Sequence, residues 1–220
     1  MPSMSTDIPF HRRHLPHFYP PDAIYFVTSR LADSLPQSVI DRAKEERESL
    51  RSHERGATRG YSGLPPYIDA IEWWEKIIER GSKDAHLLTD TRIASLVAEA
   101  IHFRDRLDYD LIAYTIMPNH VHLVFGIGKY DVLEHPADGV PLSGKQVSAI
   151  MMSLKRHTAL EANKLLERSG PFWQDESYDH VVRDSEELSR IVEYVLDNPV
   201  QACLAQSRRA WPWSYSRYEL

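Results

Sequence analysis

Hydrophobic positions change their spacing from segment to segment, and this spacing predicts which parts of the chain are strands. Residues 23–31 (AIYFVTSRL) are rich in β-branched and aromatic side chains and predict a strand. Residues 111–117 and 121–127 have the same character and flank a Pro-Asn turn, so they predict a hairpin. A further short strand is expected within residues 173–183, after a turn.

Other segments carry hydrophobic residues at helical spacing. Pro199 is expected to end the last of these helices, because proline disfavours helical backbone in the residue before it. Helices are mixed with strands, and the centre is a hairpin rather than a β–α–β unit, so the fold class is α+β. The predicted helices are 36–55, 67–80, 89–103, 143–167 and 185–198.

The chain of 220 residues is the size of one large domain. Residues 1–22 predict an extended N-terminal arm rich in His, Arg and Pro. Residues 23–205 predict a single domain with a helical insert around 36–85, and residues 206–220 predict an aromatic C-terminal tail. In residues 41–54 basic and acidic side chains alternate, as on a solvated helix face.

Composition excludes several classes of protein. Hydrophobic residues make up 42% of the chain and charged residues 26%, which indicates a soluble globular protein. No apolar run approaches the roughly 18 residues that a membrane helix needs. The N-terminus lacks the apolar core of a signal peptide, and one cysteine, Cys203, cannot form an internal disulfide, so a cytoplasmic location is expected. The net charge of −6 disfavours a protein that coats nucleic acid by broad phosphate neutralisation, but it allows a compact phosphate site.

The first candidate for chemistry is the pair His120 and His122. On a strand, residues two apart point to the same face, so both imidazoles could bind one metal ion while Val121 and Leu123 face the core. Alternatively, both histidines are hydrogen-bonded on a half-buried strand. The pair alone does not decide between these readings, because a metal site needs a third ligand.

Tyr194 and Asn198 are four residues apart, and so share one face of the predicted helix 185–198. The amide oxygen of Asn198 could reach a ligand from the last helical turn. The alternatives are an aromatic residue at the edge of the core and an ordinary helix-end residue.

Four segments together resemble the REP-associated tyrosine transposases, a branch of the single-tyrosine HUH transposases. The resemblance runs in order from about residue 10 to residue 218. It implies an antiparallel sheet of ferredoxin or RRM type with packed helices. The segments are YFVTSRLADSLP (25–36), MPNHVHLV (117–124), FWQDESYDHVVRD (172–184) and EYVLDNPVQA (193–202).

The resemblance also implies a function: metal-dependent cleavage and joining of single-stranded DNA at hairpins, through a covalent 5′-phosphotyrosine. It implies Tyr194 as nucleophile, with His120, His122 and Asn198 as ligands of Mg²⁺ or Mn²⁺. A phenol has an ordinary pKa near 10, so a nearby cation is needed to favour the phenolate. The protein would act as a monomer or a homodimer.

Two other tyrosines are rival nucleophiles. Tyr178 is expected to share a strand face with His180, but it has no amide ligand four residues away, and Tyr215 lies in the tail.

Two further functions stay open: a protein that binds DNA hairpins without cutting them, and a metal-dependent hydrolase of small molecules. The hydrolase is disfavoured because no Asp or Glu follows the histidines at ligand spacing.

DNA contacts are expected from three basic residues: Lys155, Arg156 and Arg183. For Lys155 and Arg156 the alternative is a solvated helix face. Phe172 and Trp173 could stack on an unpaired base, although a buried pair in the core is the favoured interpretation. The N-terminal arm, with His11, Arg12, Arg13 and His14, could reach the foot of a hairpin.

Overall fold

The computed structural model describes residues 10–12, 16–18, 23–32, 34, 86–128, 147–175 and 177–218. The predicted helices 36–55 and 67–80, and with them the insert 36–85, lie outside these residues. Within the predicted arm, β1 (Phe10–Arg12) and β2 (Pro16–Phe18) form a two-stranded antiparallel ladder. The part of the chain from Ala23 onward builds the main sheet.

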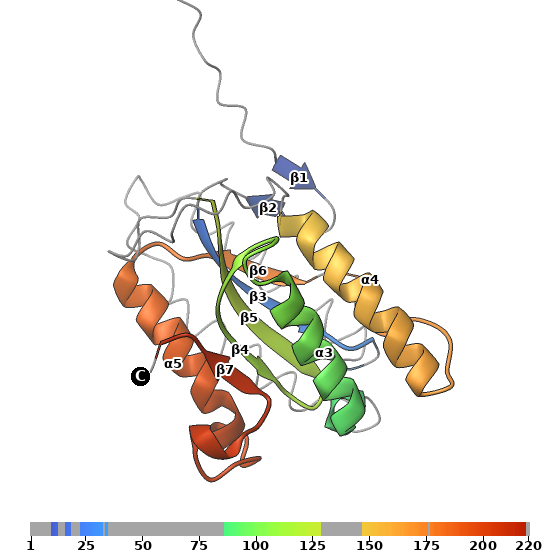
Figure 1. The fold of residues 1–220 in the computed structure, drawn as a ribbon. Coiled ribbons are helices and arrows are strands. Elements are labelled where there is room, and N and C mark those ends of the chain that lie inside the picture. Colours follow the sequence, from blue (N-terminus) through green and yellow to red (C-terminus); the bar gives the residue numbers. More distant parts are fainter. Residues whose placement is uncertain are drawn as a thin grey trace, which may run out of the picture.

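A five-stranded antiparallel sheet is the centre of the molecule, in the strand order β6-β3-β5-β4-β7 (Figure 1). β5 is therefore the middle strand, between β3 and β4. The strands are β3 (Ala23–Arg30), β4 (Asp110–Ile116), β5 (His120–Ile127), β6 (Tyr178–Val181) and β7 (Ser214–Ser216).

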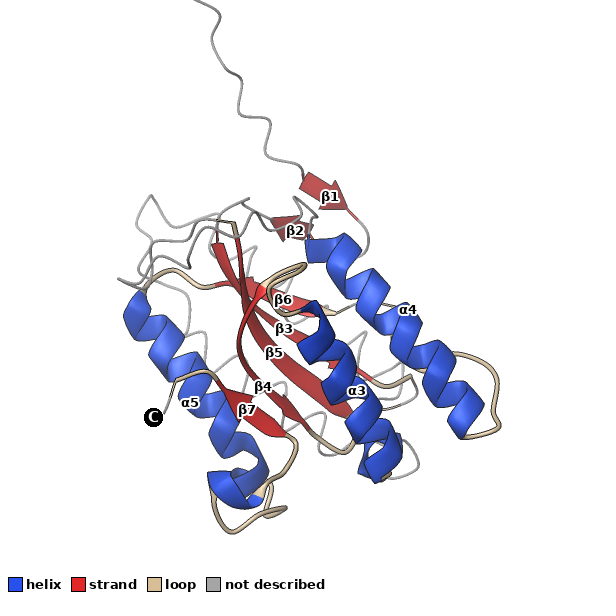
Figure 2. Cartoon of the chain, viewed as in Figure 1, coloured by secondary structure: helices blue, strands red, loops and turns tan. Residues whose placement is uncertain are grey.

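Three α-helices of the described residues cover the two faces of this sheet (Figure 2). α3 (Thr91–Arg104) and α4 (Val147–Leu165) pack on one face, and α5 (Ser185–Gln201) packs on the other. Short 3₁₀ helices, η1 (Leu87–Thr89) and η2 (Arg208–Ala210), lie in the connections. The α+β class and the antiparallel sheet expected from the sequence are confirmed.

Strand alternation divides the core into two layers. On the α3/α4 side, Val121 and Leu123 of β5 pack with Tyr25 and Val27 of β3. On the α5 side, Phe26 and its neighbours pack against the hydrophobic stripe of α5: Leu188, Ile191, Val192 and Val195. Because side chains alternate along a strand, the even-numbered residues of β5 face α5.

A β-bulge in β4 shifts its register against β5 between Leu111 and Ala113. Ile112 and Ala113 both join the core layer under α5, whereas Leu111 and Tyr114 join the other layer. A bulge inserts one extra residue into a strand. Here it brings Thr115 opposite His122 on the α5 side.

The C-terminal tail contains β7, which pairs with β4 and adds the fifth strand. Arg217 holds this strand through ion pairs to Asp110 and to Asp105, the latter with Nη2 3.0 Å from Oδ1. Burial alone would lower the pKa of Arg217, but hydrogen bonding and the nearby carboxylates outweigh it and the pKa rises. An aromatic segment is thus tied to the sheet by charge.

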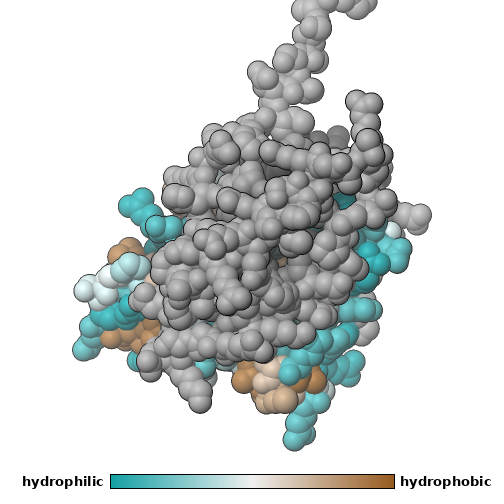
Figure 3. Space-filling model, turned by 180° about the vertical axis from the view of Figure 1, so that it is seen from behind, coloured by the Kyte–Doolittle hydropathy of each residue, from teal (hydrophilic) through white to brown (hydrophobic). Residues whose placement is uncertain are grey.

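The described helices include none that is both long and apolar enough to cross a membrane. Large hydrophobic side chains that are exposed stand on or beside the helices. Where the described residues are visible from behind, at the margins of the molecule, they are mostly hydrophilic with smaller hydrophobic areas among them (Figure 3). The large hydrophobic side chains that are exposed among the described residues are Phe103, Leu107, Met152, Leu160, Leu165 and Leu204.

Candidate active site

The two histidines lie at the beginning of the middle strand. His120 and His122 both face α5, because Val121 and Leu123 between and beyond them belong to the opposite core layer. Their ring centroids are 4.7 Å apart, and the residues are only 2% and 1% exposed. The alternation predicted from the sequence is confirmed, with both imidazoles on one face of one strand.

Each imidazole has a hydrogen-bond partner at Nδ1. The Nδ1 atom of His122 is 2.8 Å from Oγ1 of Thr28, its register partner on β3. The Nδ1 atom of His120 is 2.7 Å from Oδ1 of Asn119 in the preceding turn. Both partners are themselves buried, so the bonds are shielded from water.

α5 brings Tyr194 and Asn198 to the same face of the sheet. The helix is capped by Asp184, whose carboxylate accepts a hydrogen bond from the Glu187 backbone N–H at 2.7 Å. Tyr194 and Asn198 are both buried, and Nδ2 of Asn198 donates a long hydrogen bond of 3.4 Å to the Tyr194 hydroxyl oxygen. Residues four apart meet in this way on a helix surface.

The tyrosine ring lies beside the histidines. Ring centroids of Tyr194 and His122 are 5.6 Å apart, and Phe26 contacts both rings, at 6.3 Å and 5.3 Å. The structure therefore brings together the four residues expected at the catalytic site: His120, His122, Tyr194 and Asn198.

Pro199 lies inside α5 and does not end it, so the expected helix end at residue 198 is wrong. The helix continues to Gln201, and the backbone N–H of Ala202 donates to the carbonyl of Asn198 at 2.9 Å. Proline removes one helical N–H, but packing of this last turn on the sheet retains the helix. Asn198 is consequently a buried residue within the helix, only 3% exposed, rather than a residue of a frayed end.

The donor atoms of this group fit a divalent cation. Two imidazole nitrogens and one amide oxygen form a mixed set that Mn²⁺ accepts, and the oxygen suits Mg²⁺. In the described parts of the chain no cluster of three or more His, Cys, Asp and Glu side chains is suited to hold a metal. Asn198 lies beside Tyr194 on the histidine face and carries an amide oxygen, a donor of the kind that divalent cations accept.

A polar row crosses the sheet at the level of His122. Strand register aligns one residue from each strand on the α5 side: Tyr178, Thr28, His122, Thr115 and Ser214. At the far end, the hydroxyl oxygens of Thr115 and Ser214 are 2.7 Å apart. Thr115 therefore flanks His122 as Thr28 does, but its hydroxyl bonds elsewhere.

The rival tyrosines lie on different faces. Tyr178 is in the polar row, so it shares the histidine face, and it packs against the core layer under α5. Tyr215 packs on the opposite face, where its ring contacts Tyr114 at 5.8 Å and His102 at 4.9 Å. Geometry thus leaves Tyr178, and not Tyr215, as a competitor of Tyr194.

A charged cluster that the sequence interpretation missed holds the start of α5. Glu187 is 2% exposed and accepts hydrogen bonds from the backbone N and the guanidinium of Arg183, both at 2.7 Å. Nε2 of His180 on β6 lies 3.2 Å from the same carboxylate. The Asp-x-x-Glu spacing of residues 184–187 resembles a capping box and is the signal that could have identified this cluster.

Within this cluster the pKa values of His180 and Glu187 are both lowered. Burial disfavours the imidazolium and lowers the pKa of His180, although Glu187 opposes this. Burial alone would raise the pKa of Glu187, but hydrogen bonds from Arg183 outweigh it, so the pKa falls. The folded state therefore retains an ionised Glu187.

Two of the expected DNA-binding residues lie on α4, and the third lies just before α5. Lys155 is on α4, across the sheet from Tyr194, and its Nζ donates to the carbonyls of Gln174 and Asp175 and to the hydroxyl of Ser177. Arg156 is exposed on the same helix. Arg183 is near the start of α5 and is held by Glu187.

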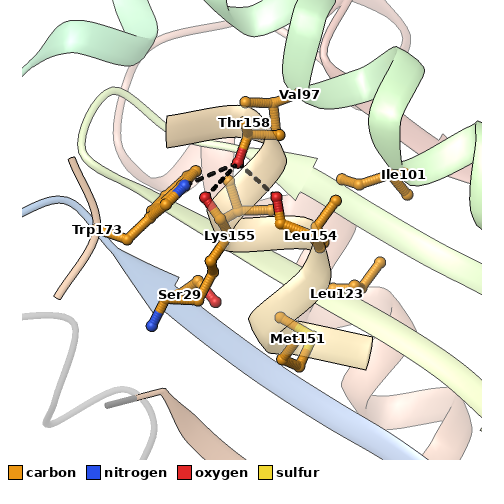
Figure 4. A pocket seen from close by; sticks show the side chains of 10 residues that line it. Ser29, Val97, Ile101, Leu123, Met151, Leu154, Lys155, Thr158 and Trp173 are labelled. Atoms are coloured by element: carbon orange, nitrogen blue, oxygen red, sulfur yellow. Dashed lines mark hydrogen bonds between the residues drawn. The ribbon is translucent and has the colours of Figure 1, made fainter. Parts of the chain in front are cut away.

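Phe172 and Trp173 form a buried pair, as favoured from the sequence, with ring centroids 5.1 Å apart. The indole N–H of Trp173 donates to Thr158 Oγ1 at 2.8 Å, and this hydroxyl in turn donates to the Leu154 carbonyl (Figure 4). Trp173, Thr158 and Leu154 line a small pocket between α4 and the sheet, and Lys155 lies at its side. Trp173 therefore belongs to the core.

Comparisons with known proteins agree with the motifs. No family model matches the chain. A Haemophilus influenzae protein named as a candidate REP-associated tyrosine transposase is 24% identical over 106 residues, or 48% of this chain and 58% of the relative. The chain thus spans little more than half the length of that relative.

A solved structure of a REP-associated tyrosine transposase bound to a REP hairpin has a similar fold. The TM-score is 0.50 at 14% identity, over 92% of this chain and 82% of the other. The resemblance expected from the motifs is confirmed: the chain is similar in sequence to the Haemophilus influenzae protein, and its α+β fold is similar to that of the solved transposase.

Proposed function

We propose that this protein is a metal-dependent single-stranded DNA endonuclease and strand transferase that acts on DNA hairpins. The observation that carries the proposal is the meeting of His120, His122, Tyr194 and Asn198 between β5 and α5. The REP hairpin bound by the structurally similar transposase supports a folded DNA substrate.

Tyr194 is the nucleophile in this proposal. Its Oη attacks the scissile phosphorus, an Oη–P bond forms, and the P–O3′ bond breaks. The phenol proton passes to solvent, and the departing 3′ oxygen takes up a proton. The products are a 5′-phosphotyrosine and a free 3′-hydroxyl, and attack by another strand's 3′-hydroxyl reverses the step and joins the strands.

The surrounding side chains prepare this attack. Asn198 donates its amide N–H to the tyrosine oxygen, where negative charge develops, and its Oδ1 is the atom that it would offer to a cation. His120 and His122 supply the imidazole nitrogens. A divalent cation held by these residues, Mg²⁺ or Mn²⁺, would polarise the scissile phosphate and stabilise the phenolate.

DNA contact by Lys155, Arg156 and Arg183 is part of the proposal but has unequal support. Arg156 is exposed on α4 and suited to contact a phosphate. Lys155 already bonds to the segment 174–177, and Arg183 to Glu187, so contact with DNA would have to share these groups.

The test is a covalent-adduct assay with labelled single-stranded hairpins, including REP sequences, in Mn²⁺ or Mg²⁺. We expect a protein–DNA adduct on denaturing gels with the wild type and with Tyr178→Phe, and none with Tyr194→Phe. Tyr178→Phe is the matched control because Tyr178 shares the histidine face. An adduct lost only in Tyr178→Phe would refute the assignment of the nucleophile.

A hairpin-binding protein that does not cleave is the second candidate. It is favoured by the burial of Tyr194, which is 5% exposed. Tight hairpin binding without an adduct in any metal would establish this alternative. Binding that persists in Tyr194→Phe, together with an adduct in the wild type, supports the nuclease.

A further inference from the structure

We propose that Thr28 and Asn119 are positioning residues that orient the two histidines so that both present Nε2 to the same cation. The inference rests on the proposed metal site and deepens it. Neither residue would touch the cation. Each acts through the hydrogen bond that it makes to one Nδ1 atom.

Asn119 determines which nitrogen of His120 carries the proton. An amide oxygen only accepts hydrogen bonds, so the 2.7 Å contact with Oδ1 requires a proton on Nδ1 of His120. Nε2 then carries the lone pair, which is the form that binds a metal. Asn119 is itself held in place, because its backbone carbonyl accepts the N–H of Leu31 at 2.9 Å.

Thr28 orients His122 from the neighbouring strand. Its hydroxyl oxygen is 2.8 Å from Nδ1 of His122 and can accept a hydrogen bond from the Nδ1–H group when Nε2 binds a cation. Phe26 stacks on the same imidazole, with ring centroids 5.3 Å apart and planes 25° apart. One side chain thus restrains the plane of the ring, and the other determines its rotation within that plane.

Loss of either hydrogen bond would let the imidazole adopt other orientations or the other tautomer. Removal of such outer-sphere partners typically lowers metal affinity by about 10–100-fold. Thr28→Val keeps the β-branched shape and removes only the hydroxyl, whereas Thr28→Ser keeps the hydroxyl. Thr115→Val is the matched control, because Thr115 also lies beside His122 but bonds to Ser214.

The first measurement is Mn²⁺ binding to the full chain, followed by the electron paramagnetic resonance signal of free Mn²⁺. We expect Thr28→Val to raise the Kd by about tenfold or more. Thr28→Ser and Thr115→Val should bind within about twofold of the wild type. If Thr28→Val and Thr115→Val weaken Mn²⁺ binding equally, the inference is overturned, because this result would indicate a general effect on the sheet.

The second measurement reads the tautomers directly, by long-range ¹H–¹⁵N spectra of the metal-free protein at pH 8. We expect the wild type to carry the proton on Nδ1 of both histidines, and Asn119→Ala to shift His120 toward the Nε2–H form. A wild type with Nε2–H at His120 overturns the inference. If the wild type binds no Mn²⁺ but has both Nδ1–H tautomers, the proposed function fails while the orienting role of the two residues stands.

Discussion

Glu187→Gln should destabilise the protein far more than the same change at the adjacent Glu186. Glu187 is buried and joins β6, the following turn and the start of α5 through His180 and Arg183. Glu186 forms an ion pair of the same spacing with Arg190, but its side chain is 83% exposed. The two variants thus differ mainly in burial.

The magnitude follows from the bonds of each carboxylate. Glutamine keeps the shape and one acceptor oxygen, but it loses the charge and one hydrogen bond from Arg183. Hydrogen bonds to a charged group contribute about 1.5–3 kcal/mol, and the 56% exposure of the Arg183 side chain favours the lower end, so we expect about 2 kcal/mol. For a protein of this size the Tm should fall by about 4–8 °C. For Glu186→Gln we expect about 0.5 kcal/mol or less.

Thermal unfolding followed by circular dichroism at pH 7 measures the Tm of both variants. Equal Tm values for the two variants would refute the reasoning, because burial would then have no effect on the contribution of the ion pair. A large fall in Glu187→Gln alone, with retained helical signal at low temperature, supports it.

The pH dependence has a definite sign. The folded pKa of Glu187 is lowered from its ordinary 4.5, so the stability it contributes is complete above that value and is lost as the pH falls toward the folded pKa. The Tm difference between the wild type and Glu187→Gln should therefore close below about pH 4.5. His180 has its pKa lowered from 6.5, so both proteins should also lose stability as the pH falls below about 6.5. A Tm difference that keeps growing below about pH 4.5 would contradict this assignment.

Three further outcomes are expected. Arg217→Gln removes ion pairs to Asp105 and Asp110, so it should cost about 2 kcal/mol and speed hydrogen exchange in β7, measured by mass spectrometry. Trp173→Phe loses the indole bond to Thr158 and should lower the free energy of unfolding in urea by about 1–2 kcal/mol. Chelation with EDTA should abolish the covalent DNA adduct, and added Mn²⁺ should restore it, with no change in circular dichroism. An adduct that forms in EDTA would remove the cation from the proposed mechanism.

Local patterns in the sequence predicted the parts of the site that depend on one segment. The shared face of His120 and His122 follows from strand alternation, and that of Tyr194 and Asn198 follows from helical spacing. The strands β3, β4, β5 and β6 and the three described helices could be located in the same way. Each of these inferences depends on neighbours within a few residues along the chain.

Contacts between distant segments could not be predicted from these patterns. Thr28 and His122 are 94 residues apart, and only the register of β3 with β5 brings them together. The continuation of α5 through Pro199 also depends on tertiary packing, which overrides the local preference of proline. β7 was read as a tail because three residues carry too little periodicity to identify a strand.

The strand order has a consequence for how the protein folds. β4 and β5 form a hairpin, but β3 pairs with segments about a hundred and a hundred and fifty residues farther along the chain. Proteins dominated by such non-local pairings fold more slowly than helical ones, because loop closure costs entropy before the contacts form. The hairpin joins neighbouring segments, whereas the polar row requires strands that are far apart in the sequence. On the ribosome, the histidines would emerge before their partners on α5, so the candidate active site would assemble only after Tyr194 and Asn198 have been synthesised.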